Sequence, residues 1–87
     1  MDVELNSTFE NARGGENMTN TALLNEIINR SGYKRSFIAR NIGLSAYGLA
    51  RKINNEREFT ASEINALCEF LSIESLELRD RVFFAKK

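Results

Sequence analysis

The sequence predicts an all-α fold, a single domain of five short helices joined by polar loops. Three observations favour this class. Apolar residues recur at three- and four-residue spacing, helix-capping residues precede several of these runs, and the chain of 87 residues contains no proline. A chain of this length holds one modest core. We expect a leader over residues 1–20 and the folded domain over residues 21–87.

The leader differs in composition from the rest of the chain. Residues 1–17 lack periodicity and hold four acidic residues against one basic residue, so we predict a disordered segment. The run Arg-Gly-Gly-Glu, just before Met18, can be encoded by a purine-rich stretch containing a bacterial ribosome-binding sequence. Two explanations stay open: translation begins at Met18 and the leader is not native, or the leader is an ordinary flexible tail.

The first helix is predicted over residues 22–30. Its apolar residues fall on one helical face, and Asn20 or Thr21 can cap its start. Ser31-Gly32 follows the last turn and ends it. The residues expected on the inward face are Leu23, Leu24, Ile27 and Ile28.

The second helix is predicted over residues 35–41, with Lys34 and Arg35 at its start opposing the helix dipole. The segment Ile42-Gly43-Leu44-Ser45 then turns the chain sharply, and we expect a positive φ at Gly43. Ser45 caps the third helix. The residues expected inside are Phe37, Ile38, Ile42, Leu44, Leu49 and Ile53, with Ala39 small where the two helices cross.

Gly48 lies within the third helix, where it costs roughly 1 kcal/mol relative to alanine. Two accounts stay open, a close approach of this helix to the second helix or a close approach to a DNA backbone.

The fourth helix carries the strongest start signal of the chain. Thr60-Ala61-Ser62-Glu63 has the pattern of a capping box, and Phe59 with Ile64 is placed as a hydrophobic staple. A polar loop over residues 54–58 precedes it. The expected buried stripe consists of Ile64, Leu67, Cys68 and Leu71, with Cys68 as a core thiol.

The fifth helix is predicted over residues 75–84, with Leu76 among its apolar residues. Its end, Val82-Phe83-Phe84, is more apolar than a chain end needs. Adjacent side chains on a helix point about 100° apart, so at least one phenylalanine is expected at the surface. We predict that these three residues help to form a homodimer; the alternative is that they cover the bottom of the core.

Composition restricts the function. The chain has no histidine, one cysteine and no apolar run of membrane-spanning length, and its polar N-terminus is no signal peptide. We therefore expect a cytoplasmic protein that is not an enzyme, holds no zinc or other metal site and takes no small-molecule substrate. The carboxylates of Glu63, Glu69, Glu74 and Glu77 show no paired catalytic spacing.

Positive charge is concentrated between residues 33 and 57, although the formal net charge of the whole chain is zero. Such a basic cluster is typical of a nucleic-acid interface, and equally of a solvated face. The segment holds one acid, Glu56, against Lys34, Arg35, Arg40, Arg51, Lys52 and Arg57.

The stretch IARNIGLSAYGLARKIN, residues 38–54, resembles the helix-turn-helix of phage repressors, the lambda-repressor and Cro-like (Xre-type) DNA-binding domains. The shared pattern begins with an aliphatic residue and an alanine, here Ile38-Ala39, and has a glycine four residues later, Gly43. An aliphatic residue and a serine follow, Leu44-Ser45, and then an inward aliphatic residue, Leu49. The resemblance covers residues 21–84 and is greatest to small phage or prophage members. It implies five helices, an operator in double-stranded DNA, no cofactor and usually dimeric binding.

The resemblance also implies which residues contact DNA, with the third helix in the major groove. Base contacts fall to Ala46, Tyr47, Ala50, Arg51 and Asn54. Arg51 suits a bidentate contact to guanine, its alternatives being a phosphate contact or a solvated side chain. Tyr47 could instead pack as a partly buried support of the helix. Phosphate contacts fall to Lys34, Arg35, Ser45, Lys52, Asn55 and Arg57, where Ser45 serves first as a cap.

Two departures from the family pattern affect the functional prediction. Lys52 stands where many relatives bury an apolar residue, and its stem can lie along the core. The outward residues Ala46, Gly48 and Ala50 offer few hydrogen-bonding groups. We therefore keep two hypotheses, a sequence-specific regulator that binds a palindromic operator, and a small phage switch protein of the same fold that binds another regulator as an antirepressor or modulator.

Overall fold

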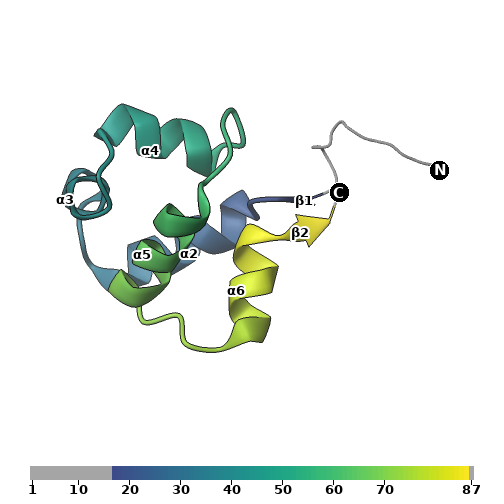
Figure 1. Cartoon of the computed structure of the whole chain (residues 1–87). Coiled ribbons are helices and arrows are strands. Elements are labelled where there is room, and N and C mark those ends of the chain that lie inside the picture. The colour runs from purple at the N-terminus through teal and green to yellow at the C-terminus, as the bar shows by residue number, and fades with distance from the viewer. Residues whose placement is uncertain (1–16, 87) are drawn as a thin grey trace.

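The computed structural model describes residues 17–86 of the chain, which form five helices and one pair of two-residue strands (Figure 1). The prediction of an all-α fold is confirmed in outline, and the strand pair is an addition to it. The predicted leader falls mainly on residues 1–16, outside the described part. The elements are β1 (Asn17–Met18), α2 (Thr21–Ser31), α3 (Arg35–Asn41), α4 (Ala46–Ile53), α5 (Ala61–Phe70), α6 (Leu76–Phe83) and β2 (Ala85–Lys86).

The boundary predicted at residue 20 is wrong, because residues 17–20 belong to the fold. β1 pairs antiparallel with β2, so Met18 lies opposite Ala85. Thr19 is buried, and the Asn20 amide donates to the Val82 carbonyl at 2.7 Å. These partners lie far away in the sequence, so local composition carries no signal of them.

Helix starts agree closely with the predicted signals. The side chains of Asn20, Ser45, Thr60 and Ser75 each accept a hydrogen bond from a first-turn amide, and Thr60 with Glu63 completes the capping box. Lys34 makes no such bond at the start of α3, which agrees with the weak N-cap predicted there.

Three successive helices, α3, α4 and α5, end in the same Schellman motif. In each, one residue has positive φ: Gly43 (83°), Asn55 (66°) and Ser72 (60°). The amide of the next residue donates back to the last turn at 2.8 Å. These bonds are Leu44 to Ala39, Glu56 to Arg51 and Ile73 to Cys68. The positive φ at Gly43 was predicted, whereas those at Asn55 and Ser72 were not.

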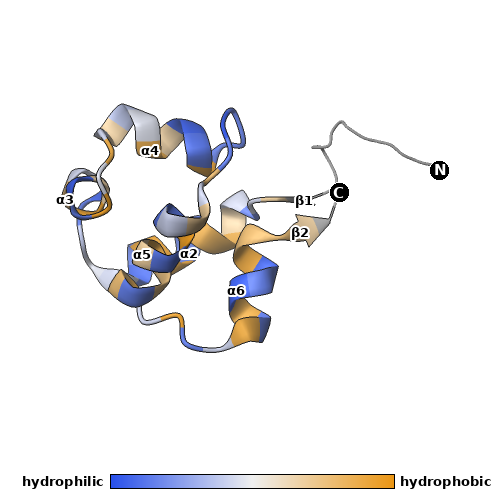
Figure 2. Cartoon of the chain, in the orientation of Figure 1, coloured by the Kyte–Doolittle hydropathy of each residue, from blue (hydrophilic) through white to orange (hydrophobic). Residues whose placement is uncertain are grey.

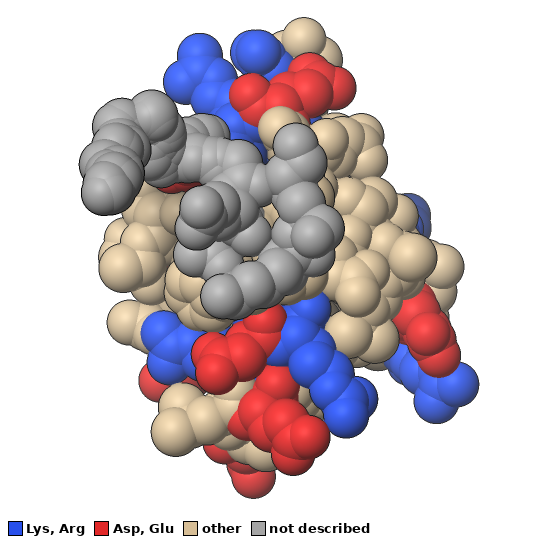
Figure 3. Space-filling model, turned by 90° about the vertical axis from the view of Figure 1, so that its right-hand side faces the viewer, with Lys and Arg blue, Asp and Glu red and all other residues tan. Residues whose placement is uncertain are grey.

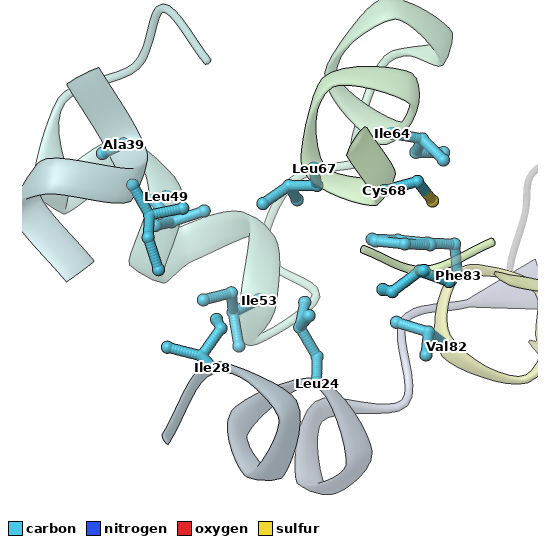
Figure 4. Close-up of a cluster of buried hydrophobic side chains, with 12 residues drawn as sticks. Leu24, Ile28, Ala39, Leu49, Ile53, Ile64, Leu67, Cys68, Val82 and Phe83 are labelled. Carbon is cyan, nitrogen blue, oxygen red and sulfur yellow. The ribbon is translucent and has the colours of Figure 1, made fainter. Parts of the chain in front are cut away.

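The core lies where α2, α3, α4, α5 and α6 meet (Figure 4). Figure 2 shows hydrophobic residues gathered between α2, α5 and α6, with hydrophilic ones along the end of α4 and the loop after it. Burial raises the pKa of the Cys68 thiol, although the charge of Arg79 acts in the opposite direction. The largest fully buried side chains are Leu24, Ile28, Ile38, Leu49, Leu67 and Val82.

One predicted core position is wrong. Phe37 is 45% exposed, because the inward face of α3 is taken by Ile38 and Ala39. Leu76, one of the apolar residues of the predicted fifth helix, is exposed at the first turn of α6. Within the described part of the chain, no helix combines the length and apolarity needed to cross a membrane.

Candidate nucleic-acid interface

The helices α3 and α4 form one unit around a tight turn. Figure 1 shows α3 nearly end-on while α4 runs across the view, so the two axes are far from parallel. Gly43 supplies the positive φ of the turn, and the Leu44 amide closes it on the Ala39 carbonyl. Leu49 of α4 and Ile38 of α3 are fully buried, so packing fixes the angle between the helices.

The five predicted base-contacting residues lie together on the outward side of α4 and its C-cap. Ala46, Tyr47, Ala50 and Asn54 are exposed, and Arg51 is half-buried. Positions three and four apart are neighbours on a helix, so these residues form one continuous strip. Tyr47 is 72% exposed, which excludes the alternative that it is a buried support of the helix.

Arg51 is held on this strip by two neighbours. Its guanidinium carbon lies 5.6 Å from the centre of the Tyr47 ring, and its Nε donates to Glu56 Oε1 at 3.3 Å. A cation over an aromatic face is attracted by the ring's quadrupole. The strip therefore presents its one arginine with a defined side-chain direction.

Lys52 does not lie free at the surface, and its predicted phosphate role is corrected. Its ammonium donates to Glu63 Oε1 at 2.6 Å, and the two side chains are only 13% and 15% exposed. Burial alone would raise the pKa of the Glu63 carboxyl, but hydrogen bonds from Lys52 and from the Thr60 amide outweigh it and hold the pKa below its ordinary value. Lys52 thus joins α4 to the start of α5.

Asn55, for which a phosphate contact was predicted, is exposed and makes hydrogen bonds within the chain. Its side chain accepts from the Thr19 amide and donates to the Thr19 carbonyl, both at 2.9 Å. The hydroxyl of Thr21 donates to the Ile53 carbonyl at the end of α4. These bonds join the residues at the start of α2 with the loop that follows α4.

The remaining predicted phosphate residues differ in their availability. Ser45 caps α4 through the Gly48 amide, as expected. Arg35 is exposed but bridges Asn25 and Asn29 of α2. Lys34 and Arg57 are exposed, and within the described residues their side chains have no hydrogen-bond or ion-pair partner; the same holds for Arg40, to which the sequence analysis gave no role.

The charge distribution separates this region from the face around the chain ends. Figure 3 shows that face, where acidic and basic side chains lie next to each other in the lower part and no single sign dominates. On α3, by contrast, every charged residue is an arginine. The cations without a partner among the described residues therefore lie at the two ends of α3, Lys34 and Arg40, and in the loop after α4, where Arg57 stands between two acids.

Of the two accounts of Gly48, the structure tests only the close approach to the second helix. A Cβ there would meet Ser45 Oγ at 3.2 Å and Leu44 Cδ2 at 4.0 Å, and no atom of α3 lies among its nearest neighbours. The close approach to the second helix is therefore wrong. The room at Gly48 is limited by the cap of its own helix.

The dimer surface predicted at the end of α6 is corrected for two of its three residues. Val82 and Phe83 are buried in the chain's own core, where Phe83 meets Phe59 edge-on at 5.5 Å between ring centres. Phe84 alone is at the surface, 41% exposed.

A cluster of three aromatic rings on another side of α3 was missed by the sequence analysis. Tyr33, Phe37 and Phe70 have ring centres 4.7 to 5.8 Å apart, and Tyr33 and Phe37 are exposed. The available signal was weak, because Tyr33 precedes the N-cap of α3 and only Phe37 lies in its first turn, so helical spacing does not join the two.

Comparison with protein-family models, curated proteins and solved structures finds no match to this chain.

Proposed function

We propose that this protein is a sequence-specific DNA-binding transcriptional regulator of phage type. It binds a palindromic operator as a dimer, places α4 in the major groove and acts by excluding polymerase. The resemblance of residues 38–54 to phage repressors suggests this role, and helix-turn-helix proteins contact bases from such a helix.

One observation carries the proposal. The outward strip of α4, centred on Tyr47 and Arg51, is exposed and lies on the same unit as cations that have no partner among the described residues, Lys34, Arg40 and Arg57. Phosphate contacts hold a protein in register on DNA while base contacts give specificity, and this surface supplies candidates for both.

The test begins with selection of binding sites from a random double-stranded DNA library by the full chain. An enriched two-fold motif is expected, with an affinity that falls steeply as salt rises. Arg57→Ala should weaken binding to all sequences alike, whereas Arg51→Ala should relax preference at one base position.

Arg81→Ala is the matched control, because it removes an exposed arginine that pairs with Glu77 on α6. This variant should bind like the unmodified chain. Absence of any enriched motif, or equal losses from Arg81→Ala and Arg57→Ala, would refute the proposal.

A second candidate function is a switch protein that binds another regulator. The aromatic cluster of Tyr33, Phe37 and Phe70 favours it, because exposed aromatic side chains are enriched in protein interfaces. In this case the chain alone shifts no DNA specifically but releases a neighbouring repressor from its operator. Phe37→Ser should abolish that release and Arg51→Ala should not.

A further inference from the structure

We propose that Glu56 is a positioning residue that orients Arg51 toward a guanine of the operator. This inference rests on the proposed DNA-binding function and adds to it the base recognised and a residue outside α4 that controls the recognition. It starts from the backbone, which brings Glu56 and Arg51 together.

The Schellman motif at the end of α4 fixes the separation of the two residues. Asn55 has positive φ, and the Glu56 amide donates to the Arg51 carbonyl at 2.8 Å. This motif usually brings two apolar side chains into contact at these two positions. Here the same geometry places a carboxylate beside a guanidinium.

The bond between the side chains leaves the recognition edge of Arg51 outside the ion pair. Glu56 Oε1 accepts from Nε, the inner nitrogen of the guanidinium. The bidentate contact to guanine O6 and N7 uses two N–H groups of an arginine, and the terminal nitrogens Nη1 and Nη2 can supply them. Glu56 therefore holds Arg51 without taking the atoms that guanine needs.

The ring of Tyr47 is a second neighbour of the same group. Tyr47 precedes Arg51 by one helical turn, and its ring centre lies 5.6 Å from the guanidinium carbon. An arginine held by two neighbours loses less side-chain freedom when it binds than an unrestrained one. Ordering a long side chain opposes binding by about 0.5–1.5 kcal/mol, or about two- to tenfold in affinity.

This role separates Glu56 from the other charges of the interface. A carboxylate near DNA repels phosphate, so a Glu56 without a positioning role would only weaken binding to every sequence. A positioning Glu56 weakens general affinity while it increases the preference for guanine. The two effects can be measured independently.

The experiment uses the operator enriched by the full chain and the base position whose preference Arg51→Ala relaxes. Affinities for guanine and for adenine at that position are compared. Glu56→Ala should lower the ratio of the two affinities by more than about twofold and up to about tenfold. Glu56→Gln keeps an acceptor for Nε and should hold the ratio within about twofold of the unmodified chain, while binding to both sites becomes tighter.

Controls separate orientation from charge and from folding. Glu74→Ala removes an exposed carboxylate from the loop before α6 and should leave the ratio unchanged. In an Arg51→Ala background, Glu56→Ala should have no effect on the ratio. Thermal unfolding checks that each variant is folded, since the backbone bond from the Glu56 amide does not need the side chain.

An unchanged ratio in Glu56→Ala, or equal losses in Glu56→Ala and Glu56→Gln, would overturn this inference. An operator in which Arg51→Ala relaxes no position would overturn it too, while DNA binding itself would stand. Failure to enrich any sequence would instead count against the proposed function as a whole.

Discussion

The ion pair between Lys52 and Glu63 gives the most direct test of how α4 is held. Both side chains are largely withdrawn from water, and one carboxylate oxygen, Oε1, accepts from the Lys52 ammonium at 2.6 Å and from the Thr60 amide at 2.9 Å. Removing one partner leaves the other charge with little access to solvent. We therefore expect strong coupling between the two residues in the free energy of unfolding.

The magnitudes follow from what each variant retains. Lys52→Met keeps the stem of the side chain and leaves Glu63 with the Thr60 amide at the start of α5, so a loss of about 1.5 kcal/mol is expected. Glu63→Gln keeps an acceptor for the capping box but leaves the Lys52 ammonium without its negative partner, so a loss of about 2 kcal/mol is expected. Glu63→Ala also loses the box, for about 3 kcal/mol.

Urea unfolding of Lys52→Met, Glu63→Gln and the double variant completes a thermodynamic cycle. The double variant should be less destabilised than the sum of the singles by about 1–2 kcal/mol. A coupling energy below about 0.3 kcal/mol, typical of an exposed pair, would refute the reasoning.

The same ion pair makes the free energy of unfolding depend on pH. The pKa of Glu63 is lowered in the folded chain, so its contribution is complete above the ordinary value of 4.5 and is lost as the pH falls through the folded value. The loss of unfolding free energy on acidification should be smaller in Glu63→Gln than in the unmodified chain. Equal acid sensitivity in the two chains would contradict the assignment.

Three further predictions concern the turns and the chain end. Ser72→Gly should raise the free energy of unfolding by about 0.5 kcal/mol, because glycine accepts the positive φ at that position. A lower free energy of unfolding in urea would contradict this. Ser72→Ala is the control and should leave the free energy unchanged. Gly43→Ala should lower the free energy of unfolding by about 1 kcal/mol through backbone strain alone, since a Cβ there meets no atom within 4 Å. An unchanged midpoint of urea unfolding would contradict this. Phe84→Ser should weaken self-association in sedimentation while leaving the fold intact, because Phe84 is the exposed member of its segment; unchanged sedimentation would remove Phe84 from any dimer contact.

Sequence reasoning succeeded where the physical signal is local. The caps at Ser45 and Thr60, the positive φ at Gly43 and the outward strip of α4 depend on residues within one or two turns of each other. Helix periodicity also identified Leu49 and Ile53 as inward residues.

Sequence reasoning failed where the role of a residue depends on which distant elements pack together. Lys52 and Asn55 look like surface groups in a basic segment, and only the packing of α4 against α5 and against the entry to α2 shows their partners. Phe37 and Ile38 are adjacent and both apolar, so periodicity in a seven-residue helix does not decide which one faces the core.

The closure of the fold at residues 17–20 has a consequence for the order of folding. The three Schellman motifs connect near neighbours in the chain, so the C-terminal ends of α3, α4 and α5 are closed by local hydrogen bonds. The bond from the Asn20 amide to Val82 and the pairing of β1 with β2 join opposite ends of the described chain, and such contacts carry the largest loop-closure entropy. In native-state hydrogen exchange, we expect the Asn20 amide to exchange faster than the amides in the middle of α5, because local unfolding begins where the two ends of the described chain meet.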